Sequence, residues 1–166
     1  TVYTAFFTPT QDGECTINVN GGRYVDTVLN SNRASNTFIW THDNTRPRII
    51  IVAKDVSNNI IQNNTTLNIT NVKLTFACTE TTNFIGDHVT LSNGIISNFT
   101  QSSANTNLYL ADFSAAGEGV CTIGVADGAY IDSVGNTGLA SNVITFTRDT
   151  INPTMMISAK NSSGVT

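Results

Sequence analysis

The chain has 166 residues, a formal net charge of −4 and only 12% charged residues, against roughly 25% in ordinary soluble domains. Its 8 Lys and Arg residues are too few for the basic surface of a nucleic-acid-binding protein. No apolar run approaches the ~20 residues that a membrane helix needs. Asparagine, threonine and serine take the place of the missing charges, a composition typical of secreted β-proteins with polar but uncharged surfaces.

An internal repeat organises the chain. Residues 1–60 align with residues 107–166 at a constant offset of 106 and without a gap. The identical pairs include Tyr3/Tyr109, Phe7/Phe113, Cys15/Cys121, Tyr24/Tyr130, Asp26/Asp132, Asn30/Asn136, Asp43/Asp149 and Pro47/Pro153. A fixed long period indicates tandem copies of one folding unit. We therefore expect residues 1–46 to be the C-terminal part of one repeat, residues 47–150 a complete repeat, and residues 151–166 the first strand of the next.

Short segments of alternating apolar and polar residues predict β-strands along the whole chain. In chain order they contain Phe38 and Trp40; residues 49–53; Val72, Leu74, Phe76 and Cys78; residues 89–91; Tyr109, Ala111 and Phe113; Cys121, Ile123 and Val125; and Ile144 and Phe146. Turn signals separate them at residues 92–94, 116–119, 127–128 and 135–136. No stretch has a sustained helical period. The pattern predicts an all-β protein made of tandem immunoglobulin-like antiparallel β-sandwich repeats, one for each period of 106.

The three cysteines are interpreted through the repeat. Cys15 and Cys121 are equivalent positions, and Cys78 lies in a part of the repeat that residues 1–46 do not contain. We expect a disulfide between Cys78 and Cys121, with the partner of Cys15 lying upstream. Such a bridge would close a loop of about 43 residues, stabilise the unit by roughly 3–4 kcal/mol, and imply an oxidising, extracellular environment.

Several motifs resemble the tandem bacterial Ig-like repeats of large extracellular surface and adhesin proteins. They are residues 76–80 (Phe-Ala-Cys-Thr-Glu) with Phe84, Asp87 and residues 89–94; residues 132–136 (Asp-Ser-Val-Gly-Asn); and the Asp-x-x-x-Pro segments 43–47 and 149–153. The resemblance implies a rod-like, multi-domain architecture used for adhesion, spacing or fibre building. Bacterial members usually lack cysteines and have Ser at the position of Thr79. The cysteines and the glycosylation motifs therefore favour a eukaryotic secreted version, of protist or algal type.

Acidic residues in loops and at the predicted junctions are candidates for a calcium site, because Ca²⁺ takes six to eight oxygen ligands from carboxylates, carbonyls and water. They are Asp43, Asp149, Glu80, Asp87, Asp26 and Asp132. A simpler interpretation stays open, in which Asp132 and Asn136 form an Asx-type turn and Asp149 caps the linker before Pro153. Calcium is the only cofactor that the sequence suggests.

Five asparagines stand in Asn-x-Ser/Thr motifs for N-linked glycosylation. They are Asn63, Asn64, Asn68, Asn98 and Asn161. A chain rich in Asn and Thr produces such motifs by chance, and Asn63 and Asn64 overlap. We nevertheless expect at least one glycan, with Asn98 as the favoured acceptor because it follows a turn.

No catalytic arrangement is recognisable, and we expect the protein not to be an enzyme. The two histidines, His42 and His88, have no metal-ligand spacing and no neighbouring nucleophile pattern. His42 aligns with Arg148 in the next copy, a change that a catalytic base would not tolerate. Trp40 aligns with Phe146, which is typical of a core aromatic and not of a sugar-binding platform.

The sequence thus predicts a structural repeat segment of a long extracellular fibrous or cell-surface protein, such as a filament, appendage or stalk. Its partners would be further copies of the repeat in cis, neighbouring chains in a filament, and N-linked glycans. The alternative is an adhesin or carbohydrate-binding Ig-like module. That alternative requires exposed aromatics with acidic or amide partners at one loop end, and the sequence contains no such cluster.

Overall fold

The computed structural model describes residues 2–164, which are built almost entirely from β-strands. Thr1 and residues 165–166, at the ends of the first and last predicted segments, lie outside this range. The strands are β1 (Gly13–Ile17), β2 (Phe38–His42), β3 (Ile49–Lys54), β4 (Thr65–Leu67), β5 (Asn71–Cys78), β6 (Val89–Ser92), β7 (Gly94–Gln101), β8 (Leu108–Ala115), β9 (Gly119–Val125) and β10 (Ile144–Arg148), with a single 3₁₀ turn, η1 (Gly86–His88), before β6.

The strands form three sheets. Strands β3-β5-β8-β7 make one four-stranded sheet, and β4-β10-β9-β6 make a second. Every pairing within these two sheets is antiparallel except that of β4 with β10, which is parallel. Strands β1 and β2 form a separate two-stranded antiparallel sheet. The prediction of an all-β fold with antiparallel sheets is therefore confirmed.

The two four-stranded sheets enclose one hydrophobic core. Strand β5 and its neighbour β8 both bury every second residue. Phe113 of β8 meets Phe146 of β10 edge-on across the sandwich, with ring centroids 6.0 Å apart. The buried residues include Ile49, Ile51, Val72, Leu74, Phe76, Phe84, Tyr109, Cys121, Ile123, Tyr130 and Ile144. The inward-facing residues predicted on β5, β8, β9 and β10 are thus confirmed.

Strands β1 and β2 pair in the register of β9 and β10. Cys15 lies opposite Trp40, and at an offset of 106 Cys121 lies opposite Phe146. Further pairs related by the same offset are Gly13–His42 and Gly119–Arg148, Ile17–Phe38 and Ile123–Ile144, and Val25–Ser31 and Ile131–Thr137. The two hairpins differ in what covers them, because Phe38 is 61% exposed whereas Ile144 is 6% exposed.

One turn occurs three times, as Asp26–Asn30, Asp55–Asn59 and Asp132–Asn136. In each copy the Asn backbone N–H and side-chain amide donate to the two carboxylate oxygens of the Asp, and the Asp N–H donates to the Asn carbonyl. These hydrogen bonds close the turn without any packing around it. The Asp55 turn follows β3 and was not predicted.

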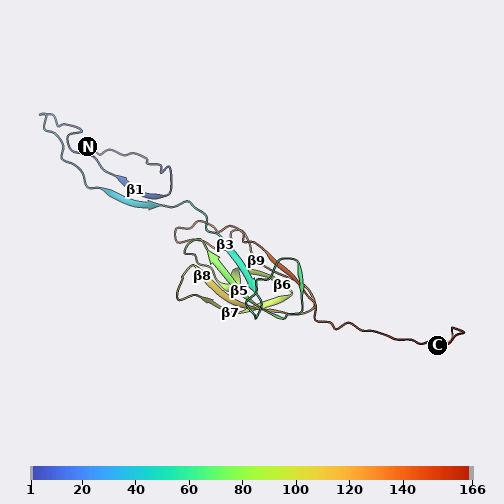
Figure 1. Ribbon diagram of the computed structural model, residues 1–166. Coiled ribbons are helices and arrows are strands. Elements are labelled where there is room, and N and C mark those ends of the chain that lie inside the picture. The colour runs from blue at the N-terminus through green and yellow to red at the C-terminus, as the bar shows by residue number, and fades with distance from the viewer. Residues whose placement is uncertain (1, 165–166) are drawn as a thin grey trace.

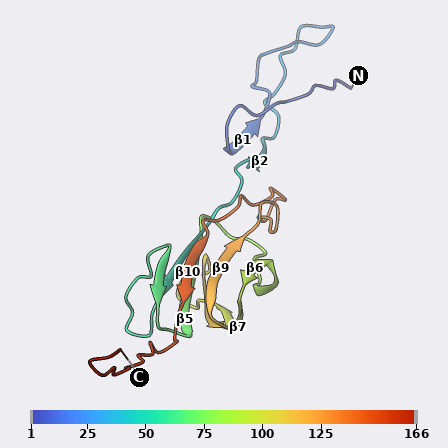
Figure 2. The ribbon, with the colours of Figure 1, turned by 90° about the vertical axis from the view of Figure 1, so that its right-hand side faces the viewer.

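The units lie in a line. Figures 1 and 2 show the β1–β2 sheet at one end, the sandwich of β3 to β10 in the middle, and the extended segment after β10 at the other end. The chain enters the sandwich at β3 at the pole nearest β2 and leaves it from β10 at the opposite pole (Figure 2).

The structure corrects the predicted disulfide, because Cys78 and Cys121 are both free thiols, as is Cys15. Cys78 is the last residue of β5 and lies level with the start of β8, since its N–H donates to the Asn107 carbonyl. Cys121 follows the end of β8 after a short turn, near the start of β9. About six strand residues therefore separate the levels of the two cysteines, which amounts to roughly 20 Å.

Gly94 offers a test of the packing at the start of β7. A Cβ at Gly94 would lie 2.2 Å from the Phe113 ring and 2.7 Å from the Ser114 carbonyl oxygen. We expect Gly94→Ala to lower the free energy of unfolding by about 1–3 kcal/mol, because overpacking displaces a core ring. Denaturant unfolding measures this.

Gly117→Ala is the matched control, since a Cβ there meets nothing closer than 3.5 Å. Its effect should stay within about 0.5 kcal/mol. Equal stabilities for the two variants would contradict the packing described for Phe113.

Candidate functional site

The linker between β2 and β3, residues 43–48, is the best-organised polar site of the described chain. On its first side it is held by Asp12, which precedes β1. The Asp12 carboxylate accepts hydrogen bonds from the Asn44 N–H at 2.9 Å and from the Thr45 hydroxyl. The Asp43 carboxylate caps the same turn by accepting from the Thr45 N–H at 3.0 Å. The start of the linker is therefore fixed to the β1–β2 sheet.

The end of the linker is fixed to the sandwich through Arg46. Its guanidinium donates to the Thr137 carbonyl at 2.7 Å, to the Gly138 carbonyl at 2.9 Å, and to the Asp127 carboxylate at 2.8 Å. Two of these three acceptors are backbone carbonyls, so the contact positions the arginine more than it neutralises a charge.

The buried Pro47 carbonyl forms the second anchor. It accepts hydrogen bonds from the Tyr130 hydroxyl at 3.1 Å and from the Leu139 N–H at 2.9 Å. Tyr130 is 1% exposed and fits closely against Gly138, where a Cβ would lie 2.2 Å from its ring. The linker thus enters the core through a tyrosine that only a glycine leaves room for.

The same holding pattern begins again after β10. Glu118, equivalent to Asp12, accepts from the Thr150 N–H at 2.9 Å, and Asp149 accepts from the Ile151 N–H at 3.1 Å. Hydrogen bonds from Thr150, followed by the charge of Arg148, lower the pKa of Glu118. The prediction that Asp149 caps the linker is confirmed.

His42 has a structural neighbour. Its Nε2 lies 3.9 Å from the Asp12 carboxylate, and Arg148 occupies the equivalent place with its Nη1 2.7 Å from Glu118. Position 42 therefore provides the basic partner of an acid at the linker. His88 lies in η1, where its ring nitrogen accepts from the Ile85 N–H at 3.4 Å.

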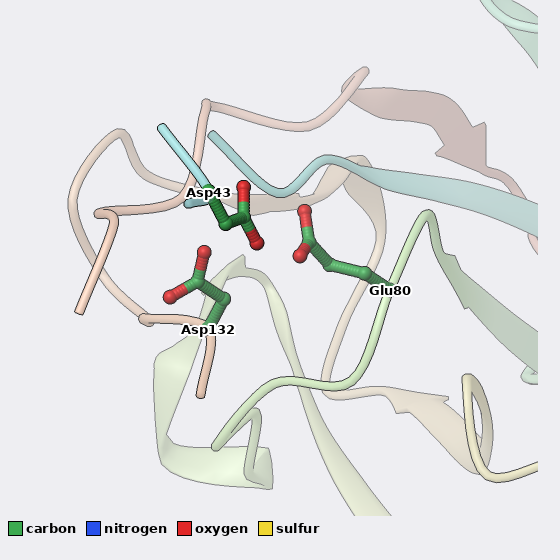
Figure 3. A group of neighbouring side chains, drawn as sticks. All are labelled: Asp43, Glu80 and Asp132. Atoms are coloured by element: carbon green, nitrogen blue, oxygen red, sulfur yellow. The ribbon is translucent and has the colours of Figure 1, made fainter. Parts of the chain in front are cut away.

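Three carboxylates converge beside the linker, from Asp43, Glu80 and Asp132 (Figure 3). One oxygen from each lies within 4.8 Å of the others. Asp132 is 5% exposed, and four N–H donors already occupy it, from Val134, Gly135 and the backbone and side chain of Asn136. We call Asp43, Glu80 and Asp132 the junction carboxylates.

The junction carboxylates have opposite pKa shifts. The pKa of Glu80 is raised, because burial, and then the negative charges of Asp43, Asp132 and Asp12, disfavour its ionised form. Burial also acts to raise the pKa of Asp132, but the hydrogen bonds from Asn136, Val134 and Gly135 outweigh it and leave the pKa lowered. Glu80 is therefore the carboxyl that carries the cost of the cluster.

The six acids predicted for calcium divide into separate places. The structure brings together three of them, the junction carboxylates. Asp26 and Asp149 hold the positions of Asp132 and Asp43 in the neighbouring copies, and Asp87 lies on η1. The Asx-turn interpretation of Asp132 is confirmed by its hydrogen bonds. Calcium binding stays a prediction, for which Glu80 and the free lone pairs of Asp43 and Asp132 would supply oxygens.

The predicted glycosylation sites differ in how far their amides are used. Asn63 exchanges two side-chain hydrogen bonds with the backbone of residues 143 and 145 beside β10, at 3.0 and 2.9 Å. Asn64 has a positive φ of 63° in the same turn. Asn98 lies at a bulge of β7, and its Nδ2 donates to Asp112 at 2.8 Å. Asn161 accepts from the Ser163 N–H. The exposed Asn68, after β4, makes no side-chain hydrogen bond within residues 2–164.

No family model, no curated protein and no solved structure matches the chain. Within residues 2–164, no helix has the length and apolar character needed to cross a membrane.

Tyr130 predicts alkaline sensitivity. Burial raises its pKa to about 12 from an ordinary value of 10.0. Because the folded pKa is the higher, this contribution to stability is complete below pH 10 and is lost as the pH rises through about 12, at up to ~1.4 kcal/mol per pH unit. We expect Tyr130→Phe to flatten this loss in unfolding measured against pH, and to lower stability at neutral pH by about 1–2 kcal/mol.

The matched control is Tyr24→Phe, the equivalent tyrosine beside the β1–β2 sheet, which is 65% exposed. It should leave both the neutral and the alkaline stability of the sandwich unchanged. If the two variants behave alike, Tyr130 is not the anchor of the linker.

Glu80 predicts a stability gain on neutralisation. A carboxyl whose pKa is raised by folding favours the folded state at low pH, and this contribution is lost as the pH rises through the folded pKa. We expect Glu80→Gln to raise the free energy of unfolding at neutral pH in a chelator, with the difference disappearing as the pH approaches 4.5, the ordinary pKa of Glu80.

Asp87→Asn, which changes an acid on η1 outside the cluster, should change little and serves as the control. Calcium added to the wild type should remove the difference if the junction carboxylates bind it. A Glu80→Gln chain less stable than the wild type in chelator would show that the carboxylate repulsion is not there.

Proposed function

We propose that the protein is a structural repeat segment of a long extracellular fibrous or cell-surface protein, in which equivalent units follow one another in cis. The observation that carries this proposal is the agreement between the two hairpins. Strands β1 and β2 repeat the register of β9 and β10, the same Asp–Asn turn follows each, and the same acid holds each linker, all at an offset of 106.

The strand order supports an immunoglobulin-like unit. In immunoglobulin constant-type domains, strands A, B, E and D form one sheet and C, F and G the other. Strands β3, β5, β7 and β8 have the order of the first set, and β6, β9 and β10 have the order of the second, with β4 added beside β10. The β1–β2 hairpin then corresponds to strands F and G of a preceding unit.

The linker supports a stiff array. Every residue from Asp43 to Arg48 takes part in a hydrogen bond with one of its two neighbouring units or within the turn itself. A linker with so many fixed backbone groups loses little further freedom on alignment, unlike a flexible Gly/Ser linker. Together with the polar, weakly charged surface, this favours a spacer or filament role over enzymatic chemistry.

The test is the growth of linked units. Chains containing two, three and four copies of residues 46–151 should lengthen by the same increment per copy in small-angle X-ray scattering. Replacement of every Arg46 by Gly removes its hydrogen bonds to Thr137, Gly138 and Asp127, and should make the increment shrink with copy number. Equal compaction of both series would reject a stiff array, and antibodies to the unit that fail to label intact cells would reject a surface role.

The proposed extracellular role also predicts a glycan, which the structure moves from Asn98 to Asn68. The Asn68 amide is exposed and free for attachment, whereas that of Asn98 is bound to Asp112 in a bulged strand. In chains secreted from eukaryotic cells, Asn68→Gln should remove an endoglycosidase-sensitive mass that Asn98→Gln retains. Unchanged intact mass after endoglycosidase treatment of the wild type would contradict glycosylation altogether.

A further inference from the structure

The β1–β2 sheet and the segment after β10 are both exposed along their apolar residues. Phe7 is 50% exposed and Phe38 61% exposed on the sheet, and Met155 and Ile157 are 88% and 87% exposed on the segment. The segment has no strand partner between residues 149 and 160. Apolar surfaces of this kind require a partner, and the sandwich itself indicates which one.

Inside the sandwich, the segment that begins with Pro47 is held against the β9–β10 side by three groups. The Pro47 carbonyl accepts from Tyr130 and from the Leu139 N–H. The Asn142 amide then clamps the backbone of Ile51 in β3, accepting from its N–H at 2.7 Å and donating to its carbonyl at 2.9 Å. These contacts recognise the main chain and a proline, and they require no particular side chain at position 51.

The β1–β2 sheet carries the same three groups at an offset of 106. Tyr24 corresponds to Tyr130, the Arg33 N–H to that of Leu139, and Asn36 to Asn142. Tyr24 is 65% exposed, against 1% for Tyr130, because nothing in residues 2–164 occupies the place that Pro47 has in the sandwich. The groups that would receive such a segment are therefore present on the sheet and accessible.

Residues 152–160 carry the matching donor. Pro153 corresponds to Pro47, and Met155, Ile157 and Ala159 correspond to the buried Ile49, Ile51 and Ala53 of β3. Met156 corresponds to Ile50, which points outward and is 51% exposed. The segment therefore presents the same proline, main-chain groups and alternating apolar side chains as the strand already held in the sandwich.

We infer that residues 152–160 of one copy of this chain dock on the β1–β2 sheet of a second copy. Ile157 exchanges main-chain hydrogen bonds with the Asn36 amide, and the Pro153 carbonyl accepts from Tyr24 and Arg33. The occupant is a second copy, because the segment and the sheet of one molecule lie at opposite ends (Figures 1 and 2). The inference rests on the equivalence of units in the proposed function, but not on where the protein acts.

The first experiment is binding of a labelled peptide of residues 151–161 to the full chain, followed by fluorescence anisotropy. Asn36→Ala should weaken binding about tenfold, because two hydrogen bonds to the main chain are lost. Asn44→Ala, an exposed linker asparagine whose side chain makes no hydrogen bond within residues 2–164, is the matched control and should bind as the wild type does.

The peptide itself keeps the test independent of folding. A peptide with Ile157→Asp should not bind, whereas Met156→Asp should bind as well as the parent, because position 156 faces outward. Absence of binding by the parent peptide, or equal binding by the two variants, would overturn the inference.

The second experiment uses sedimentation velocity of the full chain at increasing concentration. The wild type and Met156→Asp should associate, and Ile157→Asp should stay monomeric. Association that survives Ile157→Asp would assign the contact to another surface and overturn the inference. Linked units that lengthen regularly while the peptide fails to bind would leave the stiff array standing and reject only this docking.

Discussion

The carbonyl oxygen of Pro47 is buried at the point where the linker enters the sandwich, and a buried carbonyl must find a donor. Tyr130 and the Leu139 N–H satisfy it from the loop between β9 and β10. This constraint fixes the direction in which β3 starts, and Arg46 fixes the residue before it. The orientation of the β1–β2 sheet relative to the sandwich follows from these few bonds, and so does the grouping of Asp43 with Glu80 and Asp132.

Asparagine explains how a fold with so few charges holds its loops. A side-chain amide both donates and accepts, so it can replace a missing backbone partner at both of its atoms. Asn142 does so for β3, Asn63 for β10, and Asn32 for the backbone of the loop before β2. The high asparagine content is therefore part of the internal hydrogen bonding, in addition to making the surface polar.

The sequence was most informative where side chains alternate. Strands β5, β8, β9 and β10 were predicted with their inward faces because burial on one face of a sheet imposes a period of two. Strands β4 and β7 were missed, since β4 has only three residues and β7 is interrupted by the bulge at Asn98. The cysteine pairing failed for another reason. Alternation shows that a residue points inward, but not at which pole of the sandwich it lies.

The candidate site was only half predictable. The repeat marked Asp43, Tyr130 and Asp132 as recurring positions, and Asp-x-x-x-Pro marked the linker. Nothing in the pattern singled out Arg46, whose acceptors are mostly backbone carbonyls in a distant part of the sequence. A contact with distant backbone groups leaves no residue signature, so Arg46 emerged only from the structure.

The entry of the chain at one pole and its exit at the other has a mechanical consequence. Tension applied through the linkers pulls on the start of β3 and the end of β10, along the strand axes. The ladder bonds of β3 with β5, and of β10 with β4 and β9, lie across that direction. They are loaded in shear and must fail together instead of opening one at a time. A unit threaded in this way resists extension through its topology, without a covalent cross-link between its sheets.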